Sequence, residues 1–316
     1  MKLSDRIRQG DTRAAAKLIT MVENDFQQAQ KYLKELQEYC GQATVIGITG
    51  PPGSGKSTIT DRLAKHIRKI GKKIAIIAID PSSPFTGGAI LGDRIRMQDL
   101  STDKDVFIRS IGTRGQLGGL SRSTQAVVKI MDAMGKEIIF IETVGVGQSE
   151  IEVIKVSDII LLLLMPGMGD DIQIIKAGIM EIGDIFVVNK SDREGTDRLI
   201  VEIEMMLSLN DVRKRNPAII KTIGTENIGI EELWQEVERL NVYLQDKGEM
   251  QLRRKNRIRK EIHDLFLENW QELFFQFIGE DNIENEVQKI LKQDIDPYSA
   301  VQKLTEVFKK QIIKGG

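Results

Sequence analysis

The chain has 316 residues, of which 41% are hydrophobic and 29% charged, and this composition excludes disordered, collagen-like and low-complexity proteins. Its 45 Lys+Arg and 46 Asp+Glu leave a formal net charge of -1, which disfavours a nucleic-acid partner bound through a basic surface. A single cysteine, Cys40, and two histidines, His66 and His263, exclude an intrachain disulfide and a Cys/His cluster for zinc or nickel.

Residues 1–41 predict an N-terminal helical segment. Apolar residues recur at helical spacing between Ala14 and Val22, with polar residues between them, and Gly41 closes the segment. No residue pattern here points to chemistry. We therefore expect this segment to pack on the domain that follows.

Residues 42–243 alternate short apolar runs with longer amphipathic stretches. The runs are rich in Ile and Val and lack a polar residue at every second position, which is typical of parallel strands buried on both faces. They are Val45–Thr49, Ile74–Ile79, Val106–Ile108, Ile138–Ile141, Ile159–Met165, Ile185–Val188 and Ala218–Ile223. Helices are expected near Ser57–Ile70, Ser121–Met134, Ile172–Met180 and Arg198–Leu209. The pattern predicts an α/β fold whose mostly parallel sheet lies between helices.

Residues 244–316 predict only helices. A basic run, Arg253–Lys260, precedes an apolar stripe from Ile262 to Phe277 at i, i+3, i+4 and i+7 spacing. Acidic residues interrupt the basic run, so a solvated helix face is favoured over a nucleic-acid arm. The stripe can pack within the chain or against a second copy, and the pattern favours a contact between two copies.

The sequence also bears on localisation. The longest apolar run, Ile159–Met165, is far shorter than the roughly 20 residues that cross a bilayer. The charged N-terminus is not followed by an apolar core, so we expect no signal peptide. The prediction is a cytoplasmic protein without a membrane partner.

One motif predicts a phosphate-binding loop in full. It is G-x-x-x-x-G-K-[ST], and its residues are Gly50, Pro51, Pro52, Gly53, Ser54, Gly55, Lys56 and Ser57, followed by Thr58. A predicted strand precedes the motif and a predicted helix follows it, which is the context that the loop requires. Its backbone N–H groups and the helix N-terminus would surround phosphate, Lys56 would bridge the β- and γ-phosphates, and Ser57 would hold Mg²⁺. The expected architecture is therefore the three-layer sandwich of P-loop NTPases.

A second motif predicts which base is bound. Asn189, Lys190, Ser191 and Asp192 directly follow a buried run and match the N-K-x-D loop that contacts guanine in GTPases. The carboxylate of Asp192 can accept hydrogen bonds from N1–H and the 2-amino group of guanine, whereas adenine would leave that carboxylate unpaired. Asn189 would contact the base edge and the Lys190 stem its face. An ordinary surface turn is the alternative interpretation.

Acidic residues at the ends of predicted strands are candidate metal ligands. Glu142 follows one strand and precedes Gly145, where GTPases place D-x-x-G and the glycine amide contacts the γ-phosphate. Glu142 would reach Mg²⁺ directly or through water. Asp80 ends another strand, and Asp93 follows in a loop. Each acid also has an interpretation without a metal. Glu142 can be an ordinary acid at a strand end, Asp80 can start a turn as part of Asp-Pro, and Asp93 can be an ordinary loop acid.

Together these motifs resemble one known group. The residues that carry the resemblance are Gly50–Thr58, Asp80–Met97, Glu142–Glu150, Pro166–Asp171, Lys176–Ile182 and Asn189–Asp192. They resemble the MeaB/ArgK-type GTPases, bacterial relatives of the human methylmalonic aciduria type A protein. The resemblance covers nearly the whole chain.

The resemblance implies a function. Members bind GTP/GDP with Mg²⁺, hydrolyse GTP slowly when alone, and form homodimers through C-terminal helices. They associate with an adenosylcobalamin-dependent acyl-CoA mutase, usually methylmalonyl-CoA mutase, gate delivery of its cofactor, and protect or reactivate it. The resemblance implies catalytic roles for Lys56, Glu142 and Gly145, metal roles for Ser57, Asp80, Asp93 and Glu142, and a mutase-facing loop at Pro166–Gln173. The domains would be 1–41 helical, 42–243 GTPase and 244–316 dimerisation.

The chain also departs from the family pattern. The last base-contacting loop, Ile223, Gly224 and Thr225, has glycine where alanine is common. Because that contact is made largely by backbone, GTP binding should survive.

Three other functions compete with this interpretation. A small-molecule or protein kinase would need an acceptor site and a base beside the γ-phosphate. A metal-insertion GTPase would need Cys or His ligands, and a nucleotide-gated scaffold would differ only in its negligible turnover.

Overall fold

The computed structural model describes residues 1–81, 97–113, 119–143, 153–167, 183–208 and 215–315. The described chain forms two units, residues 1–254 and residues 255–316. No helix within the described ranges is both long and apolar enough to span a membrane. The expected helix near Ile172–Met180 lies outside the described residues.

The N-terminal segment is helical, as predicted, and consists of three α-helices. They are α1 (Leu3–Arg8), α2 (Thr12–Asn24) and α3 (Phe26–Leu36), followed by the 3-10 helix η1 (Gln37–Tyr39). The carboxylate of Asp11 accepts hydrogen bonds from the amides of Arg13 and Ala14, and that of Asp25 from the amide of Gln28. Each aspartate therefore caps a new helix.

All the runs predicted as strands form strands, and they pair in one parallel sheet. The strands are β1 (Thr44–Thr49), β2 (Ile74–Pro81), β3 (Val106–Thr113), β4 (Ile138–Thr143), β5 (Ile159–Leu164), β6 (Ile185–Asn189) and β7 (Ala218–Thr222). The sheet is 7-stranded, in the order β3-β2-β4-β1-β5-β6-β7. This confirms the predicted α/β architecture with a parallel sheet and places the carboxyl ends of all seven strands at one edge.

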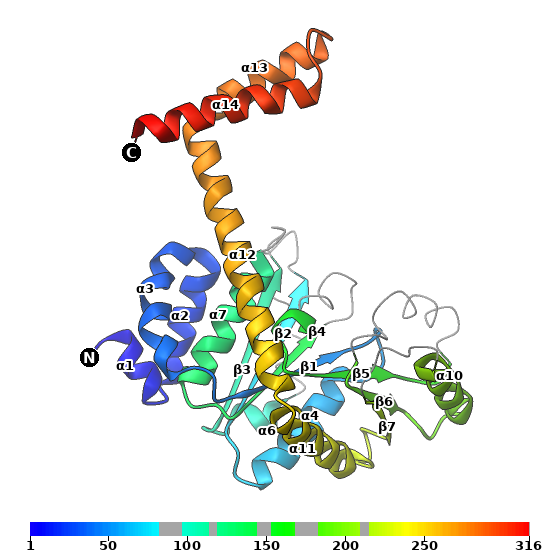
Figure 1. The fold of residues 1–316 in the computed structure, drawn as a ribbon. Helices are drawn as coiled ribbons and strands as arrows, with labels where there is room; N and C mark the ends of the chain where they lie inside the picture. Colours follow the sequence, from blue (N-terminus) through cyan, green and yellow to red (C-terminus); the bar gives the residue numbers. More distant parts are fainter. Residues whose placement is uncertain (82–96, 114–118, 144–152, 168–182, 209–214, 316) are drawn as a thin grey trace. The chain divides into compact units, whose positions relative to one another are not determined.

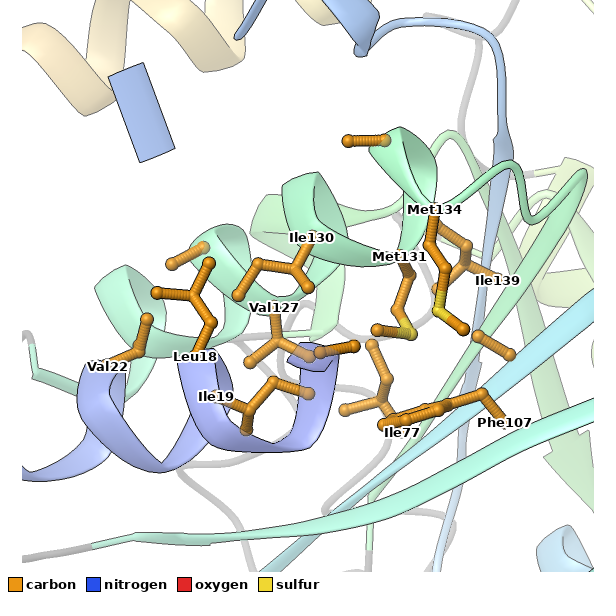
Figure 2. Packing of buried hydrophobic residues seen from close by; sticks show 14 of the residues in the cluster. Leu18, Ile19, Val22, Ile77, Phe107, Val127, Ile130, Met131, Met134 and Ile139 are labelled. Carbon is orange, nitrogen blue, oxygen red and sulfur yellow. The ribbon is translucent and has the colours of Figure 1, made fainter. Parts of the chain in front are cut away.

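One face of the sheet is covered by helices α2, α3 and α7 (Gly119–Ala133) (Figure 1). Figure 2 shows this layer, in which α2 and α7 pack on each other and on the strands. The residues labelled there are Leu18, Ile19, Val22, Ile77, Phe107, Val127, Ile130, Met131, Met134 and Ile139. The N-terminal helices thus share the core of the sheet domain, because their apolar stripes have no other surface to cover.

The opposite face packs on α4 (Lys56–Lys69), α6 (Gln98–Ser101) and α11 (Ile230–Asp246). Separately, α10 (Thr196–Ser208) buries Leu199 and Ile203 against β5 and β6. Alternate residues of one strand, such as Ile46 and Val45, belong to the two opposite clusters. Burial on both faces explains why the strand sequences are continuously apolar.

The last helices are α12 (Glu249–Ile278), α13 (Glu280–Leu291) and α14 (Pro297–Gly315). Within residues 255–316, Phe308 of α14 packs against Trp270, Phe274 and Phe277 of α12, with ring centroids 5.3 to 6.2 Å apart. Phe308 is buried, whereas Phe266 on α12 remains 59% exposed. This unit therefore has a small aromatic core and leaves much apolar surface uncovered.

Candidate nucleotide-binding site

The loop between β1 and α4 takes backbone conformations that only glycine adopts without strain. Gly50, Gly53 and Gly55 have φ angles of 140°, 77° and 92°. A Cβ on Gly50 would lie 2.1 Å from the carbonyl oxygen of Leu163, and one on Gly55 would lie 2.2 Å from Nδ2 of Asn189. The predicted glycines thus let the loop pass close to β5 and to the N-K-x-D segment.

Lys56 occupies the first residue of α4 and is buried. Its Nζ donates hydrogen bonds to the carbonyl oxygens of Gly50, at 2.6 Å, and Pro51, at 3.0 Å. The ammonium group is therefore positioned over the loop that the sequence assigns to phosphate. At a helix N-terminus, its charge adds to the positive end of the helix dipole, which favours an anion.

Two of the predicted metal ligands meet directly. The hydroxyl of Ser57 donates a hydrogen bond to the carboxylate of Glu142, which is buried at the end of β4. A hydroxyl and a carboxylate are hard oxygen donors, so this pair fits Mg²⁺.

The other predicted metal and γ-phosphate residues are only partly placed. Asp80 is the penultimate residue of β2, with its backbone opposite Gly112 of β3, and its side chain lies outside the description. Asp93 and Gly145 fall outside the described residues. Among the residues that are described, no group of three or more His, Cys, Asp or Glu side chains could hold a metal ion.

Asn189 connects three segments at the ends of β1, β6 and β7. Its Nδ2 donates to the carbonyl oxygen of Ser54, 2.8 Å away. Its Oδ1 accepts from the hydroxyl of Thr222 and from the amide of Gly224, both at 3.1 Å. The side chain is buried, so these bonds are shielded from water and fix the phosphate loop relative to the predicted base loop.

Lys190 adds a second bridge to the phosphate loop. Its Nζ donates to the carbonyl oxygen of Gly53, 2.7 Å away, and its φ of 58° is unusual for a residue with a side chain. Asp192 lies on the next turn with its side chain exposed. The hydroxyl of Thr196 closes that turn on the carbonyl oxygens of Ser191 and Arg193. The carboxylate of Asp192 is therefore accessible to an incoming ligand.

The residues Ile223–Thr225 follow β7 and pack on α4. Ile223 pairs with Ile228 in a short antiparallel bridge. The guanidinium of Arg62, a residue outside every sequence motif, donates to the carbonyl oxygens of Gly224 and Thr225. No local pattern could have revealed this contact, because its partners are 162 and 163 residues away in the chain.

The chain that forms this site matches a known protein family. A family model described as "Methylmalonyl Co-A mutase-associated GTPase MeaB" matches residues 15–276. The chain belongs to the MeaB family. The MeaB-family match covers the phosphate loop, the N-K-S-D segment and the base loop together.

Three relatives extend over most of the chain. A Pyrococcus abyssi protein named as a GTPase is 45% identical, over 100% of this chain and 97% of its own length. The GTPase ArgK of Escherichia coli K12 is 36% identical, over 78% of this chain and 77% of ArgK. The crystal structure of the LAO/AO transport system kinase superposes with a TM-score of 0.72 at 26% identity, covering 97% of this chain and 96% of that chain. The chain is thus a MeaB/ArgK-family GTPase by sequence and a P-loop NTPase by fold.

Proposed function

We propose that this protein binds GTP with Mg²⁺, hydrolyses it slowly, and acts as a chaperone that gates adenosylcobalamin delivery to an acyl-CoA mutase. The observation that carries the nucleotide part is the Asn189 network. It joins Ser54 of the phosphate loop to Thr222 at the end of β7 and to Gly224 of the base loop, so one buried side chain would link the two ends of a nucleotide site. GTP is preferred over ATP because Asp192 offers two acceptors that suit guanine and not adenine.

The described residues support charge stabilisation during hydrolysis. Lys56 would exchange its carbonyl partners for phosphate oxygens and would stabilise the charge that develops on them. Ser57 and Glu142 would hold Mg²⁺, which supplies further positive charge at the phosphates. Gly145 would contact the γ-phosphate through its amide. The sequence offers no obvious glutamine for orienting the attacking water, since Gln148 is a candidate only by its proximity to Gly145. Turnover should therefore be slow until a partner docks.

The mutase part of the proposal is supported by family membership. The matching family is described by its association with methylmalonyl-CoA mutase, so that enzyme is the first partner to test. Protection or reactivation of the mutase would require a nucleotide-dependent contact, for which the Pro166–Gln173 loop remains the candidate from sequence.

A homodimer is the proposed assembly. On α12, apolar side chains spaced four residues apart are all exposed, and they are Ile258, Ile262, Phe266 and Trp270. Such a stripe on one helix face is typical of a surface that another helix covers. In light-scattering measurements, Phe266→Glu should convert a dimer to a monomer, whereas exposed Lys260→Glu should not. A wild-type monomer at micromolar concentration would refute this assembly.

The experiment that tests the function is nucleotide turnover by the purified protein, alone and with the methylmalonyl-CoA mutase of the same organism. GTP hydrolysis that is slow alone and stimulated by the mutase, with ATP inactive, is the expected result. GTP binding without stimulation would keep the nucleotide assignment and overturn this partner. Phosphate transfer to a small molecule or protein rather than to water would establish a kinase instead.

A further inference from the structure

The base loop is attached to the helix that follows the phosphate loop. Arg62, in the second turn of α4, donates from Nε to the carbonyl oxygen of Gly224, 3.1 Å away. It also donates from a terminal nitrogen to the carbonyl oxygen of Thr225, 3.2 Å away. One guanidinium therefore fixes two consecutive carbonyl groups.

The contact between loop and helix is close as well as polar. A Cβ added to Gly224 would lie 3.0 Å from Cδ1 of Ile59 and 3.1 Å from Cγ2 of Thr58. The glycine at this position therefore lets the loop backbone lie against α4, within reach of Arg62. Glycine in place of alanine at position 224 and the hydrogen bond from Arg62 therefore both depend on the close approach of the base loop to α4.

The arginine contact also sets the direction of an amide. The carbonyl of Gly224 and the N–H of Thr225 belong to one planar trans peptide, so they point in opposite directions. Because Arg62 holds that carbonyl toward α4, the N–H of Thr225 is directed away from the helix. The N–H of Gly224 is already donated to Asn189, whereas within the described hydrogen bonds that of Thr225 has no acceptor.

We propose that Arg62 is a positioning residue for base selection, which holds the Gly224–Thr225 peptide so that the Thr225 amide donates to the 6-keto oxygen of guanine. This rests on the proposed GTP binding. A fixed N–H at this place accepts a 6-keto purine and rejects a 6-amino purine, whose own N–H would face it. Asp192 selects the other edge, through N1–H and the 2-amino group.

An arginine suits this task for a physical reason. Its planar fork presents two donors in fixed geometry, and a charged donor strengthens each bond to a carbonyl. Lys65, one turn further along α4, instead pairs with Asp61 and Asp99, each at 3.1 Å. Lys65 is therefore a matched control on the same helix without a described contact to the base loop.

The test compares Arg62→Ala, Arg62→Lys and Lys65→Ala by calorimetric titration with GDP, IDP and the diphosphate of 2,6-diaminopurine riboside. Arg62→Ala should lower GDP affinity about threefold to tenfold, as loss of one oriented hydrogen bond does. It should lower affinity for the 6-amino analogue less, so that selectivity between these two ligands falls. The GDP-to-IDP ratio, which reports the 2-amino group, should not change, and Arg62→Lys should be intermediate.

The outcomes separate the two proposals. Wild-type protein is also titrated with ADP, and if it does not prefer GDP over ADP, the proposed function fails. If wild type prefers GDP but Arg62→Ala weakens all three ligands equally, or Lys65→Ala has the same effect, Arg62 is merely structural and the inference is overturned.

Discussion

The guanidinium of Arg254 lies 2.8 Å from the carboxylate of Asp158, a side chain with 0% exposed surface. Arg254 also donates to the carbonyl oxygens of Gly41 and Ala43, and Asp158 accepts from the amide of Val45. The first turns of α12 are thereby attached to the beginning of β1 and to the residue before β5. The predicted basic run thus begins with a structural ion pair rather than with a solvated residue.

Replacement of this arginine should destabilise residues 1–254. Arg254→Ala removes the guanidinium that pairs with the buried carboxylate of Asp158, and loss of one partner costs about 3 kcal/mol in comparable buried pairs. Urea denaturation should show this loss in the free energy of unfolding. Arg259→Ala, at an exposed position on the same helix, is the control and should change it by under about 0.5 kcal/mol. Equal effects of the two variants would contradict the assigned role.

The base specificity should change with Asp192. In Asp192→Asn, the amide can no longer accept both guanine donors, so GTP affinity should fall about tenfold to hundredfold. Xanthine nucleotides, which offer an acceptor at the 2-position, should bind better than they do to wild type. Competition titrations with GTP, XTP and ATP measure this, and full retention of GTP preference would refute the base assignment.

The pair of Ser57 and Glu142 should govern magnesium dependence. Glu142→Gln keeps the shape but removes the charge, so the Mg²⁺ concentration for half-maximal turnover should rise and maximal turnover should fall about tenfold or more. Magnesium titration of GTPase activity checks this. Glu137→Gln, at the residue just before the same strand and paired with Lys72, serves as control and should behave as wild type.

Substitution by alanine should cost much more stability at Gly50 of the phosphate loop than at Gly71. Gly50→Ala forces a side chain into the backbone of Leu163 at a φ of 140°, so the variant should lose more than about 4 kcal/mol or fail to fold. Gly71→Ala also has a positive φ, of 87°, but nothing lies within 4 Å of the added Cβ. It should cost only about 1–2 kcal/mol. Expression yield and urea denaturation compare the two.

Because of Lys136, the free energy of unfolding should change with pH in the alkaline range. Burial lowers the pKa of this lysine from 10.5 to about 8, and its Nζ donates to the carbonyl oxygen of Asp105. Between pH 8 and 10.5 the unfolded chain binds more protons at this residue than the folded chain, so its contribution to stability rises with pH.

Comparison of wild type with Lys136→Met isolates the contribution of Lys136 to the pH dependence of the free energy of unfolding. Wild type should gain about 3 kcal/mol relative to the variant between pH 7 and pH 11, in urea denaturation series at each pH. Exposed Lys69→Met is the control and should follow wild type. A constant difference between wild type and Lys136→Met would show that the lysine does not titrate in this range.

Several features were determined by the sequence alone, because they depend on neighbouring residues. Each apolar run became a strand, since burial on both faces of a parallel sheet demands continuous Ile and Val. The phosphate loop and the N-K-S-D segment are contiguous motifs whose chemistry is visible in their order. The periodicity of apolar residues did not predict where one N-terminal helix ends and the next begins, at Asp11 and Asp25. Each break depends on one capping carboxylate within an otherwise helical pattern.

The tertiary structure alone decided which distant residues meet. The strand order brings Ser54 to Asn189, Arg62 to Gly224 and Arg254 to Asp158, across separations of 135, 162 and 96 residues. A charged or amide side chain can pair with any of many partners, so its type does not specify its contact. Packing of the two helical layers on the sheet makes that choice, because only one arrangement buries the apolar faces and satisfies these polar groups together.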